Sequence, residues 1–277
     1  MRFHVLGPLD VRGRGDRPLE ITSPKHRALL SLLLLEAGRV VSVDRIVDQL
    51  WGDRPPASAT ATLQTYVSQL RRLLEPDRGP REAPQLLVTR APGYALLVEQ
   101  DVVDALRLPR LVSEGTRLAE TGGLERALEL LAEASDLWRG DPYADLDGTQ
   151  SVRAHRQLLA FPPRPAHELA AGVRIRLGRA DVAVAELEPL IAEHPLRERL
   201  WARLMEALWA TGRQADALAA YQRCASLLRD ELGIEPGPEL TRLHEAVLRQ
   251  ELPAPLTRAS GAPPRTPEAT PAAYGTA

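Results

Sequence analysis

Hydrophobic and polar residues alternate through most of residues 1–22, which is the pattern of short strands with one buried face. The segment Arg12–Asp16 holds two glycines and predicts the turn of a hairpin. A more continuous apolar segment follows, with Ser23 as N-cap, Pro24 in the first turn and Gly38 just past its end. This segment predicts a helix that is buried on most sides.

A second helix is predicted over residues 43–53, after a short strand, with Ser42 or Asp44 as its cap. A third helix follows a proline-rich turn and covers residues 58–75, where Ser58 can cap it. Its apolar residues recur at the spacing of one helix face, with two more at the margin: Leu63, Val67, Leu70 and Leu74, then Tyr66 and Leu73.

Residues 85–99 alternate around the turn Arg90–Gly93 and predict a second hairpin. The order within residues 1–98 is therefore strands, three helices and a terminal hairpin. The second and third helices, with their short connection, have the size of a helix-turn-helix, and a hairpin directly after them would be a wing. The N-terminal segment is thus predicted to be an α+β winged helix-turn-helix.

Beyond residue 101 the apolar positions follow the helical period throughout. The pair Gly178-Arg179 recurs 34 residues later as Gly212-Arg213, and Ala183 and Leu187 are matched by Ala217 and Tyr221. A repeated helix, glycine turn and helix at this interval is the tetratricopeptide (TPR) pattern. Together with a degenerate hairpin at 105–138, it predicts an all-α, TPR-like domain in a chain that is mainly α.

Two segments interrupt the helical pattern. Residues 160–168 hold Pro162, Pro163 and Pro165, which predict a loop because each proline costs about 3 kcal/mol inside a helix. The last residues are rich in Pro, Ala and Thr and lack an apolar period, which predicts disorder. We therefore predict three segments: a winged helix at 1–98, a TPR-like activation domain at 99–251 and a disordered tail at 252–277.

The composition is that of a soluble globular protein, with 44% hydrophobic and 26% charged residues. The single cysteine, Cys224, excludes an internal disulfide and fits a reducing compartment. No signal-peptide core or membrane span is predicted, so we expect a cytoplasmic protein without membrane contact. Residues 1–98 hold 14 Lys and Arg against 10 Asp and Glu, while residues 99–277 hold 21 against 27. A basic N-terminal part favours an anionic partner for that part.

The sequence offers no catalytic constellation. Glu231 and Glu235 lie at a helix end and in a Pro-Gly loop, with no convergent partner for acid–base chemistry. No P-loop, GxGxxG, nucleophile elbow or metal-spaced set of His and Cys occurs. We therefore predict a protein that is not an enzyme and that needs no cofactor or metal.

The polar residues of the third predicted helix leave two interpretations open. They can form a solvated face, which is the commoner fate of polar helix residues, or they can contact DNA. Thr, Ser and Gln can hydrogen-bond base edges, and Arg can bind phosphate or the guanine edge. The preceding helix, the proline turn and Arg90 near the tip of the following hairpin favour DNA contact.

Several motifs occur along the chain in the order found in one bacterial family. They are FHVLGPLDV, SPKHRALLSLLLLEAGRVVSVDRIVDQLWGDRPP, TLQTYVSQLRRLL, VTRAPGYAL, WRGDPYADL, EHPLRERL, GRQADALAAY and ELGIEPGPEL. Residues 1–98 resemble the OmpR-type winged helix-turn-helix, and the chain to about residue 250 resembles the Streptomyces antibiotic regulatory proteins (SARPs). The resemblance implies a DNA-binding domain followed by a bacterial transcriptional activation domain. It also implies an unbroken helix where the prolines of residues 160–168 stand.

The resemblance also implies site residues. Base-contacting positions fall on Thr65, Tyr66, Ser68, Gln69 and Arg71; phosphate-contacting positions fall on Lys25, Arg27, Trp51, Thr62 and Arg72; the wing arginine for the minor groove is Arg90. From periodicity alone Tyr66 would lie at the margin of the core, and Trp51 can equally pack or donate its indole N–H to a phosphate.

The function implied is a pathway-specific activator of antibiotic or secondary-metabolite genes, associated with the nucleoid. Its implied partners are direct repeats in double-stranded promoter DNA near the −35 element, RNA polymerase holoenzyme and a second protomer placed head-to-tail. The alternative is a TPR-type adaptor whose winged domain does not contact DNA. For the activator, we expect a chain that lacks 101–251 to keep some DNA binding and to lose activation.

Overall fold

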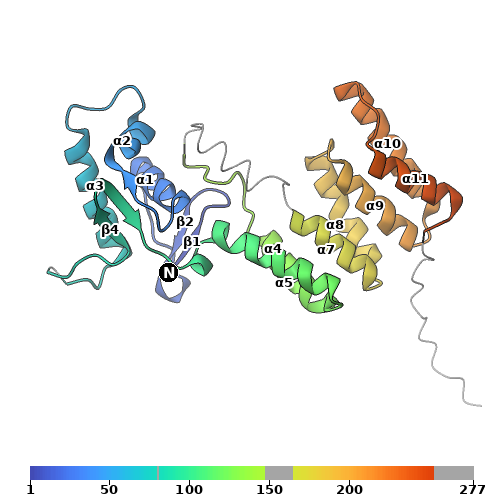
Figure 1. Cartoon of the computed structure of the whole chain (residues 1–277), viewed down its shortest axis with the longest axis horizontal. Coiled ribbons are helices and arrows are strands. Elements are labelled where there is room, and N and C mark those ends of the chain that lie inside the picture. The colour runs from blue at the N-terminus through green and yellow to red at the C-terminus, as the bar shows by residue number, and fades with distance from the viewer. Residues whose placement is uncertain (80, 147–164, 253–277) are drawn as a thin grey trace, which may run out of the picture. The chain divides into compact units, whose positions relative to one another are not determined.

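The computed structural model describes residues 1–79, 81–146 and 165–252 (Figure 1). The chain is mainly helical, with a two-stranded and a three-stranded sheet, as the sequence predicts. It divides into two compact units, Met1–Leu177 and Gly178–Ala277. Residues 253–277 of the predicted tail and residues 160–164 of the predicted loop lie outside the described residues.

The first sheet is a hairpin of β1 (Arg2–His4) and β2 (Asp10–Arg12). The turn between β1 and β2 lies at residues 5–9. The predicted turn at Arg12–Asp16 is also present: it holds the short 3₁₀ helix η1 (Arg14–Asp16), Gly13 N donates to Arg17 O at 2.8 Å, and Arg12 forms an antiparallel bridge with Pro18. Gly7 has a φ of +150° and lies so close to the segment after α5 that a side chain would collide with it. Local pattern did not reveal this turn because long-range packing stabilises it.

The helices of the winged part have the predicted order and nearly the predicted bounds: α1 (Pro24–Leu35), α2 (Val43–Trp51) and α3 (Ala59–Leu74), with the short strand β3 (Val41–Ser42) before α2. Ser42 caps α2 as predicted, because its Oγ accepts a hydrogen bond from Arg45 N at 3.3 Å. Ser23 and Ser58 occupy the predicted N-cap positions of α1 and α3, but neither side chain makes a capping hydrogen bond. Pro24 does stand at the start of α1.

The predicted wing is present as β4 (Leu87–Arg90) and β5 (Gly93–Leu96), which pair antiparallel. Strand β3 pairs with the other side of β5, giving the order β3-β5-β4. Gly93 permits this pairing, because a Cβ there would lie 1.9 Å from the carbonyl oxygen of Val41. The wing is therefore tied to the strand that leads directly into α2.

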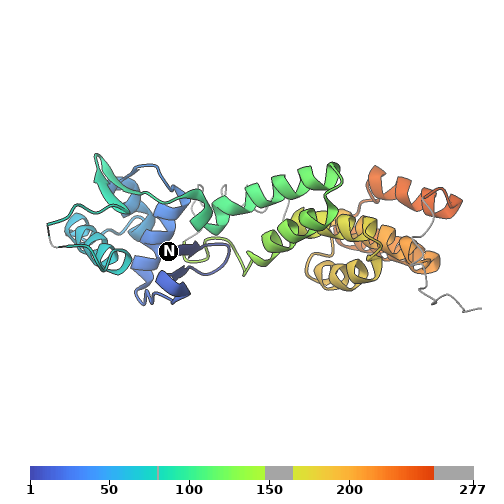
Figure 2. The ribbon, with the colours of Figure 1, turned by 90° about the horizontal axis from the view of Figure 1, so that it is seen from below.

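The elements that the structure describes in the first unit after the wing are helical: η2 (Gln100–Val102), α4 (Asp104–Glu120), α5 (Leu124–Asp136) and α7 (Pro165–Arg176). Helices α4 and α5 form the predicted hairpin and lie side by side (Figure 2). Helix α7 begins at Pro165, so the predicted loop is wrong for residues 165–168. Proline fits the first helical position because the N–H of that position needs no partner within the helix.

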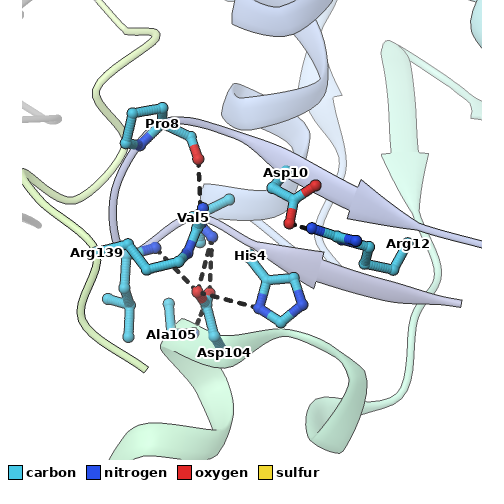
Figure 3. A network of polar contacts seen from close by, with 9 residues as sticks. His4, Val5, Pro8, Asp10, Arg12, Asp104, Ala105 and Arg139 are labelled. Carbon is cyan, nitrogen blue, oxygen red and sulfur yellow. Dashed lines mark hydrogen bonds and ion pairs between the residues drawn. The ribbon is translucent and has the colours of Figure 1, made fainter. Parts of the chain in front are cut away.

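Asp104 at the start of α4 joins the helical pair to the N-terminal hairpin (Figure 3). Its buried carboxylate accepts hydrogen bonds from Val5 N at 2.8 and 2.9 Å, from Leu6 N at 3.0 Å and from Ala105 N at 2.7 Å. Burial raises the pKa of Asp104, while these hydrogen bonds and the nearby His4 act in the opposite direction. The first turn of α4 is thus hydrogen-bonded to the loop that follows β1.

A second segment, residues 139–146, covers the same loop. It is held there by three hydrogen bonds: Arg139 N to Leu6 O at 2.7 Å, Tyr143 N to Val5 O at 2.6 Å, and Leu9 N to Asp145 Oδ2 at 2.6 Å. The Arg139 side chain also donates to Pro8 O at 3.0 Å, as Figure 3 shows. Because these contacts bury Val5 and Leu6 completely, one continuous core runs from the hairpin to α7.

The second unit contains α8 (Ala180–Glu193), α9 (Glu198–Ala210), α10 (Gln214–Leu232) and α11 (Pro238–Arg249). The repeat predicted from the sequence has a structural basis, since Gly178 and Gly212 have φ angles of +70° and +77° and both follow a helix. The repeated alanines, Ala183 and Ala217, are fully buried.

Cys224 on α10 is fully buried, and burial raises the pKa of its thiol to about 12. It therefore packs as a small apolar residue. Among the described residues, no helix is long and apolar enough to cross a lipid bilayer.

Candidate nucleic-acid interface

Helix α3 has one buried and one exposed side. Leu63, Val67 and Leu70 are at most 1% exposed, which confirms the core face that periodicity predicts. Leu73, expected to widen that face, is instead 36% exposed. The opposite side carries exposed polar residues, which are Thr65, Ser68, Gln69 and Arg72. These side chains can reach a ligand without any change in the packing of α3.

Two arginines near this face carry charges that are not neutralised within the protein. Arg72 is exposed on α3, and Arg90 is exposed at the end of β4, where it pairs with Gly93 across the wing turn. Neither has an ion pair or hydrogen bond with any residue that the structure describes. Both are therefore available to bind phosphates or a groove of DNA.

Tyr66 lies in a small aromatic cluster. Its ring centroid is 6.2 Å from that of Trp51, with the rings nearly parallel, and 4.6 Å from that of His26, with the rings edge to face. All three side chains are half-buried. Burial lowers the pKa of His26, and a hydrogen bond with Gln69 opposes this effect. The cluster fastens α1, α2 and α3 together, so packing accounts for Tyr66 and Trp51.

Arg71, expected to contact a base, is directed toward the wing. Its Nε donates to Leu87 O at 2.7 Å and its Nη2 donates to Thr89 Oγ1 at 2.8 Å. Burial lowers the pKa of Arg71. Glu75, one turn further along α3, accepts hydrogen bonds from Gln85 N and Leu86 N just before β4. Sequence reasoning missed Glu75 and Thr89, although the spacing of four residues between Arg71 and Glu75 is a signal that they share one side of α3.

The predicted phosphate contacts of α1 also have partners inside the protein. Lys25 Nζ donates to Leu50 O in the last turn of α2, where a cation is favourable. Arg27 donates to Asp145 from Nε at 2.5 Å and from Nη2 at 3.1 Å, and Nη2 also reaches Leu9 O at 2.7 Å. Thr62 is half-buried near the start of α3. The structure thus brings Thr65, Ser68, Gln69, Arg72 and Arg90 to an accessible surface, and it places Lys25, Arg27, Trp51, Tyr66 and Arg71 in contacts within the protein.

In the part of the chain that the structure describes, no group of three or more His, Cys, Asp or Glu residues could hold a metal ion. Glu235 is paired with Arg229, whose Nη2 lies 3.1 Å from its carboxylate. The arrangement at α3 and the wing is suited to binding rather than to chemical catalysis.

Two family models match the chain. Residues 16–96 match the C-terminal domain of transcriptional regulatory proteins, and residues 103–248 match the bacterial transcriptional activator domain. The chain is also similar to a solved structure of Mycobacterium tuberculosis EmbR in complex with a low-affinity phosphopeptide. That likeness has a TM-score of 0.82 and 38% identity, over 90% of this chain and 65% of the EmbR chain.

Curated relatives include the transcriptional regulatory protein EmbR of Mycobacterium tuberculosis, 39% identical over 250 residues, which are 90% of this chain and 63% of EmbR. The regulatory protein DnrI of Streptomyces peucetius is 38% identical over 256 residues, 91% of this chain and 93% of DnrI. The regulatory protein AfsR of Streptomyces coelicolor is 39% identical over 276 residues, 98% of this chain and 26% of AfsR. The chain therefore spans less than two thirds of EmbR but nearly all of DnrI, and it belongs to the Streptomyces antibiotic regulatory protein family of transcriptional regulators.

Proposed function

We propose that the protein is a sequence-specific DNA-binding transcription activator of antibiotic or secondary-metabolite genes. The observation that carries the proposal is the exposed face of α3 together with two arginine side chains that have no partner among the described residues, Arg72 on α3 and Arg90 on the wing. A helix with exposed Thr, Ser and Gln suits the major groove, and a basic hairpin beside it suits the neighbouring minor groove or backbone. Membership of a family of transcriptional regulators supports the same proposal.

In this proposal Thr65, Ser68 and Gln69 contact base edges, while Arg72 and Arg90 bind the backbone and the minor groove. The other residues implied by the family resemblance hold these side chains in place, namely Lys25, Arg27, Trp51, Thr62, Tyr66 and Arg71. Residues 1–98 supply the DNA contacts, and residues 99–251 supply the activation surface. Binding involves no chemical step.

The proposed partners are direct repeats near the −35 element, a second protomer head-to-tail on them, and RNA polymerase holoenzyme recruited to the promoter. The proposed place of action is the cytoplasm, at the nucleoid. Two half-sites in the same orientation would bind two protomers that also have the same orientation. A palindromic site would instead require a dimer with two-fold symmetry.

The proposal is tested by measuring the affinity of the full chain for promoter DNA at several salt concentrations and by footprinting the same DNA. The logarithm of the affinity is expected to fall linearly with the logarithm of the salt concentration, with a slope of about −0.9 per phosphate contact. The footprint is expected to show repeats of one orientation. Absence of binding at low salt would reject the proposal and leave the TPR-type adaptor.

Gln69→Ala is expected to relax discrimination at one or two base pairs, at about 1–3 kcal/mol if Gln69 makes a good base contact. Binding to unrelated DNA should hardly change, because the backbone contacts remain. The measurement is a comparison of affinities for a set of singly substituted operators. Thr65→Ala should act on a different base pair, and Gln64→Ala, also exposed on α3, serves as the control. An unchanged base preference in Gln69→Ala would show that this residue is not a reader.

Arg72→Ala and Arg90→Ala are each expected to weaken binding to all DNA sequences and to reduce the magnitude of the salt slope by about 0.9. The reason is that each substitution removes one exposed cation that makes no ion pair with the residues that the structure describes. Titrations at several salt concentrations on specific and random DNA report both effects. Arg126→Ala, an exposed arginine on α5, is the charge-matched control and should leave the slope unchanged.

A further inference from the structure

We infer that Arg71 and Glu75 are positioning residues that fix the wing relative to α3 and so set the distance between the two DNA contacts. The inference rests on the proposed DNA binding and deepens it. It replaces the base-contacting role that the family resemblance implies for Arg71 with a role that acts through Arg90.

The first contact runs from Arg71 to β4. The side-chain edge formed by Nε and Nη2 is committed to Leu87 O and Thr89 Oγ1. An arginine contacts guanine with two N–H groups of one edge, and the contacts with β4 occupy the Nε–Nη2 edge of Arg71 and direct its side chain toward the wing. Thr89 is next to Arg90 in the strand, so Arg71 holds the wing at the residue beside the exposed Arg90.

The second contact runs from Glu75 to the residues that enter β4. One oxygen, Oε1, accepts from Gln85 N at 2.7 Å and from Leu86 N at 3.1 Å, and the Glu75 side chain is only 11% exposed. Charge-assisted hydrogen bonds of this kind are stronger and more directional than neutral ones. Arg71 and Glu75 are four residues apart, so the C-terminal end of α3 holds four of the five positions from 85 to 89, namely 85, 86, 87 and 89.

The other edge of the wing is held by the helix-turn-helix itself. Val43 N in the first turn of α2 donates to Pro92 O at the wing turn, at 3.2 Å. The β3–β5 pairing at Gly93 lies directly beside it. The wing is therefore fixed from both sides, and Arg71 and Glu75 provide the side that faces the DNA-contacting helix.

A double-mutant cycle tests the inference. Affinity for promoter DNA is measured for the full chain and for Arg71→Ala, Arg90→Ala and the double variant. If Arg71 positions the wing, Arg90→Ala weakens the parent by about tenfold but weakens Arg71→Ala by much less. Arg71→Ala should keep the base preference of the parent in the set of substituted operators. Glu75→Ala should behave like Arg71→Ala, and Glu75→Gln, which keeps an acceptor oxygen, should restore most of the coupling.

Thr89→Val provides a milder variant, because it removes the Oγ1 acceptor while keeping the shape of the side chain and leaving α3 intact. In the Thr89→Val background, as in the Arg71→Ala background, Arg90→Ala should lower the affinity for promoter DNA by less than it does in the parent. The pair Gln69→Ala and Arg90→Ala is the control. The fold loss in DNA affinity of this double variant should equal the product of the two single losses to within about twofold. Multiplicative effects for Arg71 and Arg90, together with a changed base preference in Arg71→Ala, would overturn the inference. Failure of the parent chain to bind DNA would instead reject the proposed function.

Discussion

A fragment that ends at residue 98 is expected to lose both cooperative unfolding and promoter binding, whereas a fragment of residues 1–177 keeps both. The shorter fragment lacks Asp104, which accepts the hydrogen bonds of Val5 N and Leu6 N, and it lacks the 139–146 segment. The deletion also uncovers Val5 and Leu6, which are fully buried in the full chain, and each large apolar side chain returned to water costs about 1.5–3 kcal/mol. Thermal unfolding and DNA titration of the two fragments measure the difference.

This prediction revises the expectation that removal of 101–251 spares DNA binding, because the winged part and α4 share one core. Two variants of the full chain distinguish the contribution of these hydrogen bonds to stability from the contribution of the apolar core. Asp104→Ala leaves three buried N–H groups without this acceptor, those of Val5, Leu6 and Ala105. Asp104→Asn keeps one acceptor oxygen and removes a buried carboxyl group whose pKa is raised by burial. Asp104→Ala should be clearly the less stable of the two. Equal stability of Asp104→Ala and the parent would contradict the role given to this carboxylate.

Gly93→Ala is expected to destabilise the first unit by about 3 kcal/mol or more and to abolish specific DNA binding. The added Cβ would lie 1.9 Å from Val41 O and 2.8 Å from Ser42 Cα, and both are backbone atoms that no side-chain rotation can move away. Strands β3 and β5 would have to separate, which would release the wing from the start of α2. Chemical denaturation followed by circular dichroism measures the loss.

Gly13→Ala is the matched control for this substitution. Its φ is −84°, and an added Cβ would meet nothing closer than 3.5 Å. It should change the free energy of unfolding by no more than about 0.5 kcal/mol. If the two glycine variants were equally stable, the close approach of β3 and β5 would not exist in solution.

The helix-turn-helix could be predicted from the sequence because its signals are local. The leucine face of α3, the prolines before it and Ser42 at the start of α2 all act within a few residues of themselves. The start of α7 differs from the sequence prediction because proline is favourable at a first helical position, although it breaks a helix interior, and a proline-rich sequence does not distinguish the two.

The turn of the N-terminal hairpin could not be predicted, because its stabilising partners lie far along the chain. Asp104 is 99 residues from Val5, and Asp145 is 136 residues from Leu9. The same limit applied to Arg27, whose partner Asp145 is 118 residues away. A helical period shows which side of α3 is polar but not which neighbouring element that side meets, so the contacts of Arg71 with β4 required the structure.

The chemical reactivity of Cys224 can report when the helices of the second unit separate. It is the only cysteine in the chain, it is fully buried on α10, and its thiol has a pKa of about 12. A maleimide or disulfide reagent reacts with a thiolate that it can reach, so modification must wait until the helices around α10 separate. The rate of labelling in the folded protein therefore measures the opening of that unit alone. Repeating the measurement with DNA bound would show whether occupancy of the winged helix changes the stability of the helices in the second unit.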